Sequence, residues 1–215
     1  MYVILNAAMS IDGKITTRKN DSSISSKIDW VRVHKLRSTV DGIVIGISTV
    51  LKDDPMLNVR YARAVKNPAR IIIDSKARIP LDSRIMRSSK KIQTFVAVTH
   101  DASLKKIKEI EKKGVKVLVM GREKVNFINL FQHLEKLGLK KILVEGGGEI
   151  NWSVLKLGLV NELIVTIAPI VIGGRDAKTL VEGEGISYIY NAIRMKLVKS
   201  IIQDKKEIVL IYSLR

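Results

Sequence analysis

The stretch KKILVEGGGEINW, residues 140–152, contains the pattern that decides the fold. An apolar run ends at Glu145, three glycines follow, and a helical pattern begins at Glu149. Glycine lets the backbone pass close to a ligand, and the free N–H groups at a helix N-terminus attract phosphate. The stretch therefore predicts a strand, an anion-binding turn and a helix, with a tight connection that binds no ligand as the alternative. It lacks the GxGxxG spacing, and no Gly-Lys-Ser or Gly-Lys-Thr of a P-loop follows.

Similar apolar runs recur on both sides of this stretch and alternate with helical patterns. Periodicity predicts strands at residues 2–8, 42–46, 70–74, 94–98, 115–120, 141–144, 163–168, 195–203 and 207–213. Helices are predicted after a Ser26-x-x-Asp29 capping box, at residues 102–113 after Asp101, and at residues 127–137. Alternating strands and helices favour parallel strands with crossover connections, whereas the last two strands read as an antiparallel hairpin. We expect an α/β fold with three layers and a mostly parallel sheet, in a single domain spanning residues 1–215.

The composition narrows the class of protein. Of the 215 residues, 46% are hydrophobic and only 5% aromatic, so the core must consist mainly of Ile, Val and Leu. The absence of cysteine excludes disulfides, thiolate zinc sites and a cysteine nucleophile, and it indicates an intracellular protein. No run reaches the roughly 20 apolar residues of a membrane span, and no signal-peptide pattern opens the chain. We expect a cytoplasmic protein with no membrane partner and no metal.

The net charge of +17 would suit a nucleic-acid partner. The basic residues are scattered and interleaved with acids, however, as in KKIKEIEKKG at residues 105–114, and the ten aromatic residues are spread over the chain. We therefore expect a solvated basic surface and no nucleic-acid partner, and keep a basic nucleic-acid-binding module as the non-enzyme alternative.

Polar residues follow further apolar runs, and ligands bind at these strand ends in parallel sheets. Ser75, Lys76 and Arg78 follow residues 70–74, where a hydroxyl with basic neighbours would suit a 2′-phosphate, whereas an acid such as Asp74 would hold a free ribose. An ordinary basic loop is the alternative. The stretch GISTVLKDDPMLNVR, residues 46–60, contains good turn chemistry at residues 53–55, which leaves Thr49 and Arg60 unexplained.

Seven motifs occur in a fixed order along nearly the whole chain. They are SIDGK at residues 10–14, SSIS at 22–25, HKLR at 34–37, GISTVLKDDPML at 46–57, DSKAR at 74–78, VEGG at 144–147 and APIVIGG at 168–174. In this order the motifs resemble the reductases of riboflavin biosynthesis, which belong to the dihydrofolate-reductase-like superfamily. The resemblance implies a dihydrofolate-reductase-like fold, a homodimer, and hydride transfer from NADPH, with NADH a weaker alternative, to a ribosylaminopyrimidine 5′-phosphate.

The resemblance also implies roles for particular residues. On the cofactor side it places Thr49, Asp53, Ser75, Lys76, Ala77, Arg78, Val125, Gly147, Gly148, Glu149 and Ile150. On the substrate side it places Ser22, Arg37, Leu57, Arg60 and Glu145, with Arg37 and Arg60 suited to the phosphate. Asp53 and Glu145 are the candidate acids for the ribose ring oxygen, although either could simply hydrogen-bond a ligand. We expect His34 and Trp30 to serve packing.

Two departures from the bacterial pattern affect the choice of substrate. Ser23 stands where many bacterial members have Trp, and the chain starts at the reductase without the cysteine-containing zinc deaminase that precedes it there. This resembles the archaeal and fungal branch, which reduces the 2,5-diaminopyrimidinone before deamination. The deaminated uracil compound, or a pterin substrate of a dihydrofolate reductase, remains the alternative.

Overall fold

The chain forms two structural units, which we describe separately. The computed structural model describes residues 1–214. The first unit comprises Met1 and His34–Leu143, and the second comprises Tyr2–Val33 and the chain from Val144 onward. The boundaries fall within helix α1 (Lys27–Arg37) and within strand β6 (Lys141–Val144). No helix within residues 1–214 is long and apolar enough to cross a membrane.

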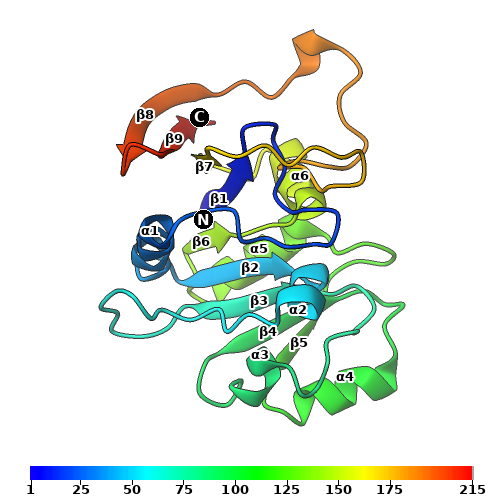
Figure 1. The fold of residues 1–215 in the computed structure, drawn as a ribbon. Coiled ribbons are helices and arrows are strands. Elements are labelled where there is room, and N and C mark those ends of the chain that lie inside the picture. Colours follow the sequence, from blue (N-terminus) through cyan, green and yellow to red (C-terminus); the bar gives the residue numbers. More distant parts are fainter. Residues whose placement is uncertain (215) are drawn as a thin grey trace. The chain divides into compact units, whose positions relative to one another are not determined.

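A parallel sheet forms the centre of the first unit (Figure 1). Its strands are β2 (Gly42–Gly46), β3 (Ala69–Ile73), β4 (Thr94–Val98) and β5 (Lys116–Val119), in the order β5-β4-β3-β2. Every residue of β3 and β4 is buried, and most are β-branched or aromatic. These strands are therefore the core of the unit, as expected for parallel strands covered on both faces.

Four helices connect the strands of the first unit: α2 (Ile47–Asp53), α3 (Arg84–Arg87), α4 (Leu104–Glu111) and α5 (Phe127–Lys136). Helix α5 buries Leu130 and Leu134 completely, and the chain leaves it through Gly138 at φ +87°. The predicted start of α4 is wrong, because its N-cap is Ser103 rather than Asp101. Helices α2 and α3 are short, and neither is predicted from the sequence.

The second unit contains the strands that bring the two ends of the chain together. Strands β1 (Tyr2–Ser10) and β7 (Glu162–Ala168) are parallel, whereas β9 (Glu207–Ser213) runs antiparallel to β7 and β8 (Lys196–Gln203) antiparallel to β9. The order is β1-β7-β9-β8, so β8 is an edge strand. Helix α6 (Gly148–Lys156) and a short 3₁₀ helix (Ile189–Asn191) complete the unit. The predicted mostly parallel sheet with an antiparallel C-terminal hairpin is thus confirmed.

Candidate active site

The glycine turn before α6 offers open space at one position and none at the next. A Cβ added to Gly147 would meet no atom within 4 Å. A Cβ on Gly148 would lie 2.6 Å from Glu182 Cγ and 2.8 Å from the Thr179 carbonyl oxygen. Gly146 has φ +82°, which favours glycine. Gly147 therefore leaves room for a ligand in front of the first N–H groups of α6, whereas Gly148 is required for packing.

The packing partner of this turn is the segment formed by residues 177–183. Asn151, in the first turns of α6, donates from Nδ2 to the Leu180 carbonyl oxygen over 2.7 Å. On its other side the segment bonds to the loop that follows β1, because the Leu180 N–H donates to the Gly13 carbonyl and Lys14 Nζ donates to the Ala177 carbonyl. Residues 177–183 thus connect the SIDGK loop to the start of α6.

The first and last of the seven motifs are joined through Asp12. Its carboxylate accepts hydrogen bonds from Ser10 Oγ at 2.6 Å, from the Ile172 N–H at 3.0 Å and from the Gly173 N–H at 2.7 Å. The Ser10 hydroxyl, followed by these two backbone donors, lowers the pKa of Asp12 to about 2. Asp12 therefore has a role in shaping the loops, since its carboxylate oxygens are occupied by the chain itself.

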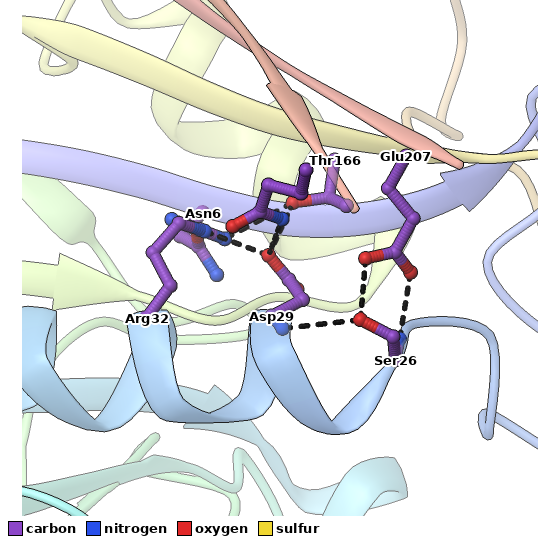
Figure 2. Close-up of polar contacts among 7 residues, drawn as sticks. Asn6, Ser26, Asp29, Arg32, Thr166 and Glu207 are labelled. Atoms are coloured by element: carbon purple, nitrogen blue, oxygen red, sulfur yellow. Dashed lines mark hydrogen bonds and ion pairs between the residues drawn. The ribbon is translucent and has the colours of Figure 1, made fainter. Parts of the chain in front are cut away.

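Ser22 lies in a tight turn whose end is fixed by the last strand. The Ser22 carbonyl accepts the Ile24 N–H, and Asp21 Oδ1 accepts the Ser23 N–H at 2.9 Å. Figure 2 shows Ser26 donating to both carboxylate oxygens of Glu207, from its N–H and from its hydroxyl, over 2.6 Å each. Glu207 is buried in β9. A residue near the C-terminus therefore holds the end of the loop that contains Ser22.

These bonds correct the predicted capping box at the start of α1. Ser26 Oγ accepts the Asp29 N–H as expected, at 3.2 Å. The Ser26 N–H, however, donates to the carboxylate of Glu207 and not to that of Asp29. The Asp29 carboxylate instead accepts from Arg32 Nε at 2.7 Å and from the Thr166 hydroxyl at 2.8 Å (Figure 2). Asp29 is thus a buried connection between the first turn of α1 and β7.

In the first unit, Asp74 shapes the turn at residues 75–78. Its side chain is fully buried, and its Oδ2 accepts the Ile79 N–H at 2.8 Å. The Asp74 carbonyl accepts the Ala77 N–H, while Ala77 adopts a left-handed φ of +53°. Arg78 Nε lies 3.6 Å from Oδ1. Asp74 is therefore a buried carboxylate that holds the backbone of its own turn.

The side chains of the same turn point in different directions. Lys76 and Arg78 are exposed and Ser75 is half-buried, whereas Ala77 is buried. Val125, Leu57 and Ile150, which the resemblance also assigned to ligands, are buried as well. Among these predicted residues, Lys76 and Arg78 therefore expose their side chains to solvent, whereas the apolar ones are buried.

Helix α2 contains Thr49 and Asp53, and the predicted turn at residues 53–55 begins at its last residue. Asp53 is the last residue of the helix, and Asp54 caps it with a left-handed φ of +37°. Asp54 Oδ1 in turn accepts the Arg84 N–H at the start of α3, over 2.8 Å. The Asp53-Asp54-Pro55 turn is therefore a helix end held by a neighbouring helix, and it presents Asp53 to solvent.

Arg37 and Arg60 are brought to the same part of the first unit. Arg37 Nη1 donates to the Asn58 carbonyl over 3.3 Å. One turn earlier on α1, His34 Nδ1 accepts the Arg60 N–H at 3.0 Å. From the sequence we expect His34 to serve packing, and this contact is not predicted, although the place of His34 in the HKLR motif is a signal for it. Ser22, Glu145 and residues 147–150 belong to the second unit.

Comparisons with known proteins agree with the order of the motifs. The family model of the RibD C-terminal domain matches residues 1–210. A protein of Methanothermobacter thermautotrophicus named 2,5-diamino-6-ribosylamino-4(3H)-pyrimidinone 5′-phosphate reductase is 43% identical over 93% of this chain and 92% of its own length. An Aquifex aeolicus protein of the same name is 37% identical over 95% of this chain and 93% of its own length.

Solved structures agree with the fold. The RibD protein of Acinetobacter baumannii superposes with a TM-score of 0.84 at 27% identity, over 99% of this chain and 57% of that one. A dihydrofolate reductase from Enterococcus faecalis superposes with a TM-score of 0.55 at 11% identity, over 99% of this chain and 95% of that one, and this likeness concerns the fold alone. The predicted dihydrofolate-reductase-like fold is confirmed, and the chain belongs to the RibD C-terminal domain family.

Proposed function

We propose that the protein reduces the ribosyl group of 2,5-diamino-6-(ribosylamino)-4(3H)-pyrimidinone 5′-phosphate to the ribityl form, with NADPH, in riboflavin biosynthesis. The observation that carries the proposal is the 43% identity to a reductase of that name over more than nine-tenths of both chains. The motifs that the resemblance linked to cofactor and substrate lie within the matched residues 1–210.

Two features of the structure fit a nicotinamide dinucleotide. The open space beside Gly147 would let a pyrophosphate or a nicotinamide approach the backbone, and the N–H groups of α6 favour negative charge. Ser75 with the exposed Lys76 and Arg78 would suit a 2′-phosphate, so we propose NADPH over NADH. When bound, the cofactor supplies the hydride, and the chain supplies binding and orientation.

On the substrate side we propose that Arg37 and Arg60 hold the 5′-phosphate. The contacts to Asn58 and Arg60 place both guanidinium-bearing residues around one short segment. No ion pair among residues 1–214 engages Arg60, so its charge is available for an anion. Charge-assisted bonds to phosphate contribute roughly 1.5–3 kcal/mol each. Ser22, Leu57 and Glu145 are proposed to contact the remainder of the substrate.

Opening of the ribose ring requires a proton on the departing ring oxygen. Asp53 and Glu145 are the proposed donors, Asp53 from the exposed end of α2 and Glu145 from the end of β6. Substituting each by its amide separates the roles, because an amide preserves hydrogen bonding to a ligand and cannot donate an acidic proton. If the substituted residue is the proton donor, its amide variant should have a lower kcat with little change in KM.

The proposed function is tested by following NADPH oxidation with the diamino and the deaminated ribosyl phosphates side by side. We expect a higher kcat/KM for the diamino compound, and a lower kcat/KM when NADH replaces NADPH. Equal rates with both pyrimidines would overturn the choice of substrate, and no turnover of either would overturn the function. Methotrexate binding tests the dihydrofolate reductase alternative, which predicts tight inhibition. We further propose a homodimer, which light scattering would detect as twice the mass of one chain.

A further inference from the structure

Residues 54–68 contain neither helix nor strand, and they include two of the proposed substrate residues, Leu57 and Arg60. Such a segment has no ladder of backbone bonds to fix it, so side chains from elsewhere must do so. Arg84 supplies its backbone N–H to Asp54 at one end, and Arg70 donates from Nη1 to the Met56 carbonyl over 3.4 Å. Further along the segment, the N–H of Arg60 donates a hydrogen bond to His34 on α1.

The last turn of α1 holds the part of the segment that surrounds Arg60. His34 is 1% exposed, and its Nδ1 accepts the Arg60 N–H at 3.0 Å. Its ring also packs edge-to-face against Tyr61, with ring centroids 4.8 Å apart. The Arg60 guanidinium in turn lies over the Tyr61 ring, 5.6 Å from its centroid. His34 thus contacts both the backbone that bears the guanidinium and the ring beneath it.

We propose that His34 is a positioning residue for substrate-phosphate recognition, acting through Arg60. The inference rests on the proposed function, since it assigns the phosphate to Arg60. A guanidinium on a long side chain binds phosphate well only when its stem and its backbone are already ordered, because ordering a long side chain costs conformational entropy. The imidazole supplies an acceptor at Nδ1 for the backbone and an apolar face for the aromatic support.

The chemistry of this contact defines the substitutions. Asparagine places its Oδ1 close to the position of Nδ1 and can accept the same N–H, whereas leucine has similar bulk and no acceptor. Glutamine carries an amide that is one bond further out, so its acceptor is displaced. His34→Asn therefore keeps the backbone bond without the ring, and His34→Leu removes the bond while the site stays filled.

The experiment measures KM and kcat for the phosphorylated substrate and its dephosphorylated form, in the wild type, His34→Leu, His34→Asn and Arg60→Ala. We expect His34→Leu to raise KM for the phosphorylated substrate roughly threefold to tenfold, the loss of one hydrogen bond. KM for NADPH and for the dephosphorylated substrate should stay near the wild-type values. His34→Asn should recover most of the affinity, and His34→Leu should add nothing in the Arg60→Ala background.

The outcomes separate this inference from the function on which it rests. A phosphate-dependent penalty for Arg60→Ala, with a silent or fully additive His34→Leu, would overturn the positioning role alone. Equal penalties on both substrates for His34→Leu and His34→Asn would also overturn it, since packing would then explain the residue. If Arg60→Ala shows no phosphate dependence, the phosphate assignment itself is wrong. Should His34→Leu unfold, His34→Gln takes its place, with the same expected phosphate-dependent rise in KM.

Discussion

At the scale of single residues, Asp74 is a buried carboxylate that works on the backbone of its own loop. Burial raises its pKa, an effect that the Ile79 N–H and the nearby Arg78 only partly offset. A carboxyl whose pKa is higher in the folded state than its ordinary value of 3.8 makes folding less favourable as the pH rises through that interval. The native chain therefore keeps Asp74 at a cost in stability at neutral pH.

Substitution of Asp74 separates its charge from its hydrogen bond. Asp74→Asn can still accept the Ile79 N–H without burying a charge, so we expect equal or higher stability at pH 7. Asp74→Ala leaves that N–H unsatisfied and should lower the free energy of unfolding by about 1–3 kcal/mol. Urea unfolding of the three proteins at pH 7 and at pH 4 provides the measurement. A larger loss for Asn than for Ala would contradict this account.

His34 and Asp74 show what residue-level sequence reasoning could and could not predict. Both belong to motifs that the sequence analysis singled out, so their importance was visible. Their burial was not visible, because it depends on which segments pack over them. Their hydrogen bonds could not be predicted either, because Asp74 accepts the Ile79 N–H and His34 accepts the N–H of Arg60, which lies 26 residues away.

At the scale of elements, the adjacent residues Gly147 and Gly148 before α6 allow a matched pair of substitutions with different expected effects. Gly147→Val places its side chain in open space, so we expect a folded protein with at least tenfold weaker NADPH binding. Gly148→Val meets Glu182 and the Thr179 carbonyl and should cost about 1–3 kcal/mol of stability. Thermal unfolding and NADPH titration distinguish them. Wild-type NADPH affinity in folded Gly147→Val would make the turn purely structural.

Elements with a long periodic pattern were predicted well, and elements fixed by distant contacts were not. Strands β2, β4, β6 and β9 have the predicted bounds, because apolar runs flanked by turns define them locally. Helix α2 was missed because it has seven residues, three of them β-branched, and no side-chain cap. The capping of α1 could not be predicted either, since Glu207 lies 181 residues from Ser26.

At the scale of the whole molecule, most of the net positive charge lies in residues 34–143, although basic and acidic residues are interleaved there. Residues 34–143 contain 24 basic and 10 acidic side chains, whereas the remaining residues contain 14 and 11. A positive field of this kind attracts an anionic substrate and is screened by salt. We therefore infer that charge accelerates binding of the phosphorylated substrate.

This inference predicts a salt dependence that differs between two substrates. Raising the ionic strength from about 0.01 M to about 0.15 M shortens the Debye length from roughly 30 Å to roughly 8 Å. We expect kcat/KM for the phosphorylated substrate to fall severalfold over this range, while that for the dephosphorylated form stays nearly constant. Parallel slopes for the two substrates would show that salt acts on the enzyme and not on the encounter.

The bonds between Ser26 and Glu207 also set an order of events during synthesis. On the ribosome, the turn at Ser22 emerges early, yet the carboxylate that fixes its end is added 181 residues later. Strand β1 likewise cannot form its parallel pairing with β7 until the chain has been made beyond Glu162, where β7 begins. Residues His34–Leu143 form an uninterrupted stretch of the first unit. A product truncated before Glu207 would therefore lack the carboxylate that holds the end of the Ser22 turn.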